Sequence, residues 1–234
     1  MTEKKTLSPW FWVPTLYFAE GIPYFLVNNI SVMMFAKMGV PNDQLAFFTT
    51  LLYFPWFLKG IWAPLVDVVK TKRWWIVSMQ ILLTVACILL TVTLPKPDAA
   101  TIAVKGTQVG IFTFTLILFI IAAFASATHD IAADGYYMLA HDQSSQARFI
   151  GIRSTFYRIA SVFGQGVLVF IAGVVETRTD DIPYSWEVTL GVTAAVMCVI
   201  TLYHLFVLPK PAEDKPRTAD TDKPASTLRE MGNA

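Results

Sequence analysis

The sequence predicts an all-α membrane protein that crosses the bilayer with six helices. Hydrophobic residues make up 55% of its 234 positions, and the mean hydropathy is positive, so the composition lies outside that of soluble globular domains. Six apolar stretches each reach the roughly 20 residues that a helix needs to span the hydrocarbon core. Short polar connections separate these stretches, which indicates consecutive membrane-spanning helices.

The first span is expected over residues 9–36, with Ser8 as its N-cap and Pro9 at the first helical position. This stretch is about twice as long as the apolar part of a signal peptide and contains Glu20, so we expect it to stay in the membrane. The other spans are expected over residues 44–66, 74–94, 109–140, 147–175 and 187–208.

The basic residues of the connections predict that both termini are cytoplasmic. With the N-terminus inside, the outer connections hold only Lys37, Lys96, Lys105 and Arg178. The inner segments then hold a larger set: Lys4, Lys5, Lys70, Lys72, Arg73, Arg148, Lys210, Lys215, Arg217, Lys223 and Arg229.

Residues 209–234 are predicted to form a disordered cytoplasmic tail or linker, because Pro, Asp and Lys replace the apolar residues there. Near the end of this segment, Thr227 and Glu230 have the spacing of a capping box, which is typical of a helix start. We therefore expect the chain to stop where a further element begins.

Nucleic acid is not expected as a partner, because the net charge is +1 and no basic stretch alternates with aromatic residues. Cys87 and Cys198 lie in apolar runs, where a thiol behaves as a small hydrophobic group. A metal site built from His129, Asp130 and Asp134 is also not expected, since His129 is rotated by about 100° from Asp130 on a helix. The sequence therefore predicts no cofactor and no metal ion.

The sequence also raises the alternative of an enzyme, because two aspartates followed by Gly occur in membrane phosphotransferases that join CDP-alcohols. That family requires D-G-x-x-A-R and a second aspartate pair to hold metal ions. After Asp134 and Gly135, Met138 and Leu139 stand where Ala-Arg would be, and no later aspartate pair lies within a span. We therefore expect no enzymatic activity.

Six ionisable residues fall well inside the predicted spans: Glu20, Lys59, Asp130, Asp134, Arg153 and Arg158. A charge at mid-bilayer costs about 3 kcal/mol on insertion scales. Six uncompensated charges would prevent stable insertion of a chain of this size. They must be paired with one another or face water.

Helical spacing predicts two ion pairs between spans four and five. Asp130 and Asp134 are four residues apart and share one helix face. A turn near Gln143 then places Asp134 level with Arg153, and Asp130 nearly level with Arg158.

A third pair, between Glu20 and Lys59, is expected across the hairpin near Pro41, although the two lie about one turn out of level. Such pairs sometimes only fix helix register. All six charges lie on spans one, two, four and five, however, and this distribution favours four helices around a water-filled cavity.

The backbone of two spans points to interruptions and close packing. Gly21 and Pro23 interrupt the first span, which frees carbonyl groups that need a partner or water. In the fifth span, Ala160, Gly164 and Gly166 provide small residues for close helix approach. The tripeptides AEG at 19–21 and ADG at 133–135 open two groups of three spans, as in an inverted repeat of three plus three helices.

Taken together, four motifs resemble the muropeptide permease (AmpG-like) family of the major facilitator superfamily, and more distantly its acetyl-coenzyme A transporter relatives. The motifs are FAEGIPYFL at 18–26, FLKGIWAPLVD at 57–67, SATHDIAADGYYML at 126–139 and YRIASVFGQG at 157–166. They cover nearly the whole chain in order. The resemblance implies the N-terminal half of a transporter, built as a 3+3 inverted repeat.

What the resemblance implies for function is proton-driven import of anhydromuropeptides across a bacterial inner membrane. Asp130, Asp134, Arg153 and Arg158 are expected to form a charge network, with Glu20 and Lys59 as a second polar pair facing the cavity. Groups that would hydrogen-bond the polar solute are expected at Tyr24, Asn28, Tyr157 and Gln165.

A cytoplasmic gate is also implied at the loop between spans two and three, where the superfamily carries an acid and several bases. The matching residues are Gly60, Asp67, Lys72 and Arg73. The usual Gly-Arg-Arg run is replaced by VVKTKRWW, and His129 stands where relatives often carry Gln, so the sequence departs from the family pattern at both places.

One half cannot enclose a cavity, so a complementary C-terminal half or a second copy is expected as a partner, besides the lipid bilayer, the solute and protons. A different reading is a non-transporting half-size membrane module that docks with other membrane subunits. Six further spans encoded downstream would separate the two readings in favour of the transporter.

Overall fold

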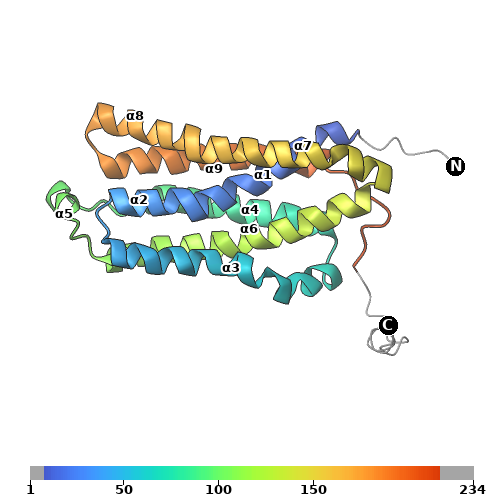
Figure 1. Ribbon diagram of the computed structural model, residues 1–234, viewed down its shortest axis with the longest axis horizontal. Helices are drawn as coiled ribbons and strands as arrows, with labels where there is room; N and C mark the ends of the chain where they lie inside the picture. Colours follow the sequence, from blue (N-terminus) through green and yellow to red (C-terminus); the bar gives the residue numbers. More distant parts are fainter. Residues whose placement is uncertain (1–7, 217–234) are drawn as a thin grey trace.

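The computed structural model describes residues 8–216, which form an elongated bundle of helices with no strand in that range (Figure 1). The regular elements are the short turns η1 (Pro9–Phe11) and η3 (Val109–Phe112), the π-helical segments η2 (Leu26–Ile30) and η4 (Phe163–Leu168), and the helices α1 (Val13–Phe25), α2 (Ser31–Lys37), α3 (Asn42–Val68), α4 (Lys72–Val92), α5 (Ala99–Ala103), α6 (Thr113–Ala140), α7 (Gln143–Val162), α8 (Val169–Thr179) and α9 (Ile182–Val207).

Within the described range, five helices are long and apolar enough to cross a membrane: Asn42–Val68, Lys72–Val92, Gly110–Ala140, Gln143–Thr179 and Ile182–Val207. The first expected span is helical throughout α1, η2 and α2, but it is not one of these five. Its polar residues, Glu20, Asn28 and Asn29, lower its hydropathy. The sixth span and the inverted repeat therefore stay predictions.

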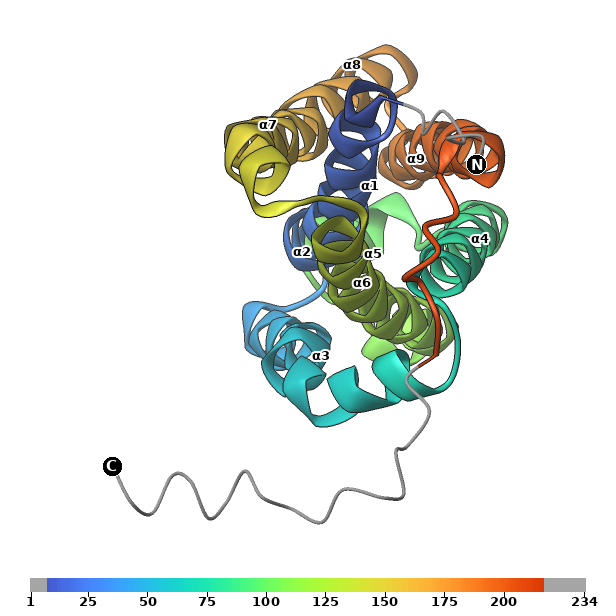
Figure 2. The same cartoon turned by 90° about the vertical axis from the view of Figure 1, so that its right-hand side faces the viewer.

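The centre of the bundle is occupied by the run of α1, η2 and α2 together with α6 (Figure 2). Helices α4 and α9 pack against each other on one side, while α3 packs on α6 and α7 packs on α1 on the other. A central helix is surrounded by protein rather than lipid, so it tolerates polar residues that a lipid-facing helix does not. This position explains why the first run is less apolar than its neighbours.

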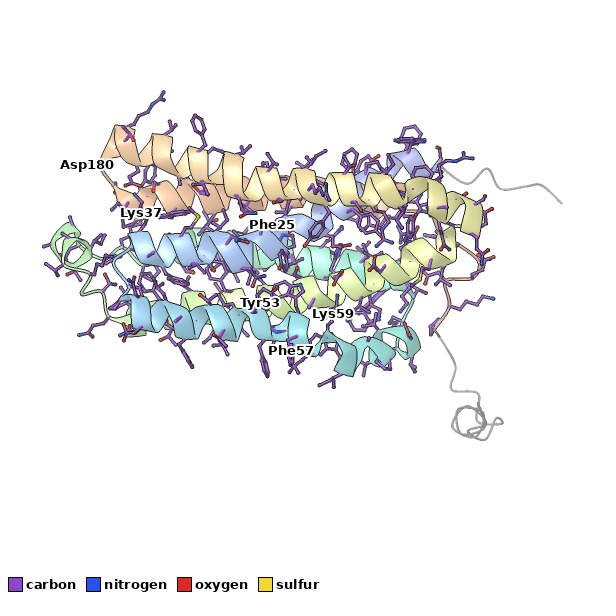
Figure 3. The ribbon with its side chains drawn as sticks, in the orientation of Figure 1. Phe25, Lys37, Tyr53, Phe57, Lys59 and Asp180 are labelled. Carbon is purple, nitrogen blue, oxygen red and sulfur yellow. The ribbon has the colours of Figure 1, made fainter. Side chains whose placement is uncertain are left out.

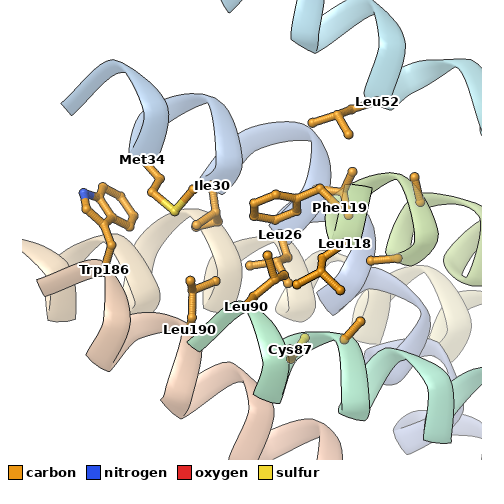
Figure 4. Close-up of a cluster of buried hydrophobic side chains, with 14 of the residues drawn as sticks. Leu26, Ile30, Met34, Leu52, Cys87, Leu90, Leu118, Phe119, Trp186 and Leu190 are labelled. Atoms are coloured by element: carbon orange, nitrogen blue, oxygen red, sulfur yellow. The ribbon is translucent and has the colours of Figure 1, made fainter. Parts of the chain in front are cut away.

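Large apolar side chains from five segments of the chain fill the core beside α2 (Figure 4). Leu26, Met34, Leu90, Phe119 and Leu190 belong to one cluster and are almost completely buried. In a bilayer, where lipid tails are as apolar as these residues, the gain comes from close van der Waals packing between helices.

The two ends of the bundle carry different numbers of basic residues. The start of α1, the α3–α4 and α6–α7 turns and the end of α9 lie at one end, whereas α5 and the α8–α9 turn lie at the other (Figure 1). The basic side chains at the first end include Lys70, Lys72, Arg73, Arg148, Lys210 and Lys215. The Lys and Arg residues expected at 4, 5, 217, 223 and 229, and the capping box at 227–230, lie outside the described residues.

Close contact between α1 and α7 depends on two glycines. A Cβ atom at Gly21 would lie 2.6 Å from the Cβ of Ala160, and one at Gly164 would lie 2.9 Å from the Cβ of Phe25. Both distances are shorter than side chains tolerate. The expectation of close helix approach is therefore confirmed at Ala160 and Gly164, and Gly21 is the residue that receives Ala160. It is not confirmed at Gly166, where an added Cβ would meet only Val162 of the same helical run, at 3.9 Å.

We predict that Gly21→Ala lowers the thermal stability of the purified protein. Overpacking at this contact costs about 1–3 kcal/mol, which outweighs the gain of about 1 kcal/mol from replacing glycine in a helix. The matched control is Gly151→Ala on α7, where an added Cβ meets no atom within 4 Å. The melting temperature in detergent should fall for Gly21→Ala and rise or stay constant for Gly151→Ala; equal shifts would contradict the close approach.

Candidate functional site

The carboxylate of Asp134 on α6 forms an ion pair with Arg153 on α7, as the hairpin argument predicts. The hydroxyl of Tyr17 on α1 donates a hydrogen bond to the same Asp134 oxygen at 3.0 Å. The guanidinium of Arg153 lies 4.3 Å from the ring centre of Tyr17 and 4.5 Å from that of Tyr137, which places the cation over two aromatic faces. Three helices are thus joined at one carboxylate.

The partner of Asp130 is Lys59 on α3, not Arg158, so the expected pair between Asp130 and Arg158 is wrong. The reason lies in the path of α7, which packs on α1 after the α6–α7 turn and moves away from α6 (Figure 2). Arg153, close to the turn, still reaches α6. Arg158, more than one turn further along α7, does not, and α3 supplies the cation instead.

The expected pair between Glu20 and Lys59 is also wrong, because Lys59 is bound to Asp130. Glu20 is only 8% exposed, and its Oε2 atom is buried with no hydrogen-bond partner among the described residues.

Two adjoining cavities lie among these side chains. The first, of about 290 Å³, is lined by Glu20, Tyr24, Trp56, Lys59, Ser126, Asp130 and Tyr157. The second, of about 400 Å³, is lined by Tyr17, Glu20, Ile150, Arg153, Ser154, Tyr157 and Arg158. Glu20 and Tyr157 belong to both linings, so these two residues separate the cavities.

The four expected hydrogen-bonding residues differ in their surroundings. Tyr24 and Tyr157 line the first cavity, and the Tyr24 hydroxyl lies 3.0 Å from that of Tyr53. The Asn28 amide donates to the carbonyl of Tyr24 at 3.1 Å, and the Gln165 amide donates to the Ser161 hydroxyl at 2.9 Å. The structure therefore places Tyr24 and Tyr157 at the charged site. The side chains of Asn28 and Gln165 instead form hydrogen bonds within their own helical runs.

Along α3, some side chains point toward the bundle and others point to its outer face (Figure 3). Lys59 reaches Asp130 and Tyr53 reaches Tyr24, whereas Phe57 is 80% exposed. One helix thus presents both polar groups for the cavity and apolar groups for its surroundings.

A buried polar network lies behind the charged site, and the sequence interpretation missed it. The Gln80 amide nitrogen lies 3.0 Å from Nε2 of His129 and 2.8 Å from Nδ1 of His204, and the Thr15 hydroxyl lies 2.9 Å from Nε2 of His204. The three central side chains are fully buried. His129 therefore faces α4 and α9 rather than the cavity. A signal was present, since Gln80 and His204 are strongly polar side chains within the mainly apolar helices α4 and α9.

At the end of the bundle that holds the α3–α4 turn, three of the four expected gate residues come together. Lys72 forms an ion pair with Asp67, and the Arg73 side chain donates to the carbonyls of Leu205 at 2.7 Å and Leu208 at 3.1 Å. Gly60 lies about two turns earlier on α3, where an added Cβ would meet no atom within 4 Å.

Asp214 joins this cluster from the segment that follows α9. Its carboxylate accepts hydrogen bonds from the backbone N–H groups of Lys72 at 2.6 Å and Arg73 at 3.0 Å. It therefore occupies the N-terminus of α4, where a negative charge is favoured. The Tyr136 hydroxyl also donates to the carbonyl of Pro209 at 2.8 Å. We call residues 208–214 the strap, because they cross the ends of α4 and α6.

No cluster of three or more His, Cys, Asp or Glu residues that would hold a metal ion is found within residues 8–216. The charged groups of the site are instead arranged as two ion pairs, one buried acid and one further arginine. Ionisable residues inside a membrane bundle often mark paths for solutes or ions.

The helices and the charged groups inside them define a multi-pass membrane protein. A family model of the Major Facilitator Superfamily matches residues 15–233, and the chain belongs to this superfamily of membrane transporters. This match identifies the superfamily and does not distinguish the muropeptide permease family within it.

Two curated relatives extend the comparison. An uncharacterized protein of Schizosaccharomyces pombe is 29% identical over 67% of this chain and 30% of its own length. An uncharacterized protein of Haemophilus influenzae is 24% identical over 86% of this chain and 43% of its own length. The chain thus aligns with less than half the length of each of these relatives. No solved structure matches it.

We predict that the pair of Asp130 and Lys59 can be removed together with less damage than either partner alone. Lys59→Met and Asp130→Asn should each lower the melting temperature, because each leaves one charge uncompensated in the bundle. The double variant should melt closer to wild type than the sum of the single effects. Arg158→Met combined with Asp130→Asn is the control, and its effects should add; non-additivity in that combination would restore the pair expected from the sequence.

We also predict that Asp214→Ala loosens the first turn of α4. Loss of a carboxylate at a helix N-terminus costs about 0.3–2 kcal/mol, and it removes the acceptor of the Lys72 and Arg73 amides. Hydrogen exchange of these amides should become faster, while Glu213→Ala, which removes a neighbouring charge, should leave them protected. Unchanged protection in Asp214→Ala would show that the strap does not hold α4.

Proposed function

We propose that this chain forms one half of a secondary active transporter that imports a small polar solute together with protons. The observation that carries this proposal is the placement of two acids, Glu20 and Asp130, and three bases around two cavities of the bundle, with the third acid, Asp134, paired to one of these bases. Charges within a membrane bundle usually mark a path for solutes or ions. Membership of the Major Facilitator Superfamily supports the same reading.

A sugar-peptide such as an anhydromuropeptide fits the chemistry of the cavities. Tyr24, Trp56 and Tyr157 offer aromatic faces and hydroxyl groups for a sugar ring, while Lys59 and Arg158 offer charges for the carboxylates of a peptide. Aromatic walls with a few placed polar groups are usual in small-molecule sites. The resemblance of SATHDIAADGYYML at 126–139 to the muropeptide permeases supports this choice of solute.

A complementary half, or a second copy of the chain, is proposed to cover the cavities. The Lys59 side chain is 44% exposed, and Arg158 is exposed as well. Such groups would be costly against lipid tails. A second helical bundle over α3 and α7 would shield them from lipid and leave water and solute as their neighbours.

For the location, we propose a bacterial inner membrane with both termini in the cytoplasm. The basic residues gathered at the end of the bundle that holds the α3–α4 turn support this orientation under the positive-inside rule. The cluster of Asp67, Lys72 and Arg73 would then form a cytoplasmic gate, held in part by the strap.

The test uses membrane vesicles that contain this chain with a second six-helix half. A pH gradient that is acidic outside should drive uptake of labelled anhydromuropeptide. Asp134→Asn should reduce the initial rate about tenfold, because Arg153 then lacks its counter-charge. Asp43→Asn, at the exposed start of α3, is the matched control and should transport normally. Wild-type rates in Asp134→Asn would remove this carboxylate from the mechanism, and no uptake by wild type would favour a non-transporting membrane module.

A further inference from the structure

Glu20 differs from the other two acids of the site in its surroundings. Asp130 is neutralised by Lys59 and Asp134 by Arg153, whereas Glu20 belongs to no ion pair among the described residues. It is also the most buried of the three, at 8% exposure, and its Oε2 atom has no hydrogen-bond partner in that range. A buried carboxylate without a cation partner is costly when ionised.

The groups that face Glu20 make its negative charge still less favourable. Asp130 on α6 is acidic and lines the first cavity together with Glu20, and Arg153 on α7, which lines the second, is already bound to Asp134. Lys59 on α3 lines the first cavity together with Glu20, but its ammonium group is bound to Asp130. Neighbouring carboxylates avoid sharing one site in the ionised form. Of the three acids, Glu20 is therefore the one that gains most from binding a proton.

Among the three bases, Arg158 is the one without an ion-pair partner in the described part of the chain. It lines the second cavity together with Glu20, and it makes no ion pair with any described residue. When Glu20 is ionised, the six charges sum to zero, with Glu20 and Arg158 as the two unpaired members. When Glu20 holds a proton, the cavity has one positive charge in excess, and an anionic group beside Arg158 cancels it.

We propose that Glu20 carries the coupling proton and that Arg158 binds an anionic group of the solute in the same cavity. This inference rests on the proposed transport function and deepens it. The proton adds to a carboxylate oxygen of Glu20, and the solute carboxylate then pairs with the Arg158 guanidinium without losing its own charge. On release, the solute leaves Arg158, the proton returns to water, and Glu20 and Arg158 compensate each other again.

The charge balance explains why proton and solute would move together. The empty site with ionised Glu20 and the site loaded with one proton and one anionic group are both neutral. A site that holds only the proton or only the anion carries a net charge, which is unfavourable inside the membrane. The neutral states are therefore the ones expected to change conformation.

Proton binding by Glu20 is tested on the reconstituted chain without any solute. Infrared difference spectra recorded across the neutral pH range should show a protonated carboxyl band that titrates. The band should be absent from Glu20→Gln and present in Asp130→Asn and Asp134→Asn. A band that persists in Glu20→Gln, or that vanishes only in one of the aspartate variants, would overturn the assignment.

Coupling is tested in vesicles with labelled 1,6-anhydro-N-acetylmuramic acid, a sugar with one carboxylate. In wild type, a pH gradient should drive accumulation, whereas a membrane potential alone should not, because one proton and one anion move together without net charge. Glu20→Gln should keep solute exchange across the membrane but reduce the accumulation ratio to about one. Undiminished accumulation in Glu20→Gln would refute the role of Glu20 while leaving the transport function standing.

The role of Arg158 is tested with the same sugar and its neutral amide. Arg158→Gln should raise the KM for the carboxylate at least tenfold and leave the KM for the amide unchanged, and Arg158→Lys should restore part of the difference. Equal effects on both solutes would reject Arg158 as the anion site. If wild type transports neither solute, the proposed function fails, and the infrared measurement still decides whether Glu20 binds the proton.

Discussion

The structure depends on one electrostatic constraint: a charge inside the bundle must have a counter-charge, a proton or water. The ion pair of Asp134 and Arg153 meets this constraint and joins α6 to α7, while the Tyr17 hydroxyl adds α1 to the same carboxylate. The pair of Asp130 and Lys59 joins α6 to α3 in the same way. The helices that surround the cavities are therefore held by the same groups that give the cavities their chemistry.

The sequence was sufficient for features that depend on composition and on local spacing. Long apolar runs predict the helices, and the separation of 19 positions between Asp134 and Arg153 across one turn predicts a correct ion pair. The pairs that spacing predicts for Arg158 and for Glu20 are wrong, because the ion-pair partners of these residues depend on which helices pack together. That choice is made by contacts such as Gly21 with Ala160, which draws α7 toward α1 and away from α6.

Side chains that act across the bundle were the hardest to predict. Gln80 and His204 stand in two spans far apart in the sequence, and only the packing of α4 on both α9 and α6 brings them together with His129. The same is true of Asp214, whose role at the start of α4 requires the chain to return across the bundle end. A polar residue in an otherwise apolar span signals that a partner exists but does not identify it.

The strap changes the point from which any following part of the chain would leave the bundle. Because Asp214 is fastened to the first amides of α4, a connection that continues from it would start beneath the α3–α4 turn instead of at the end of α9. A pull on that connection would act directly on the turn that carries Asp67 and Lys72. The strap would then work as a tether, through which movement of an attached body reaches the ion pair of Asp67 and Lys72 without any contact between their helices.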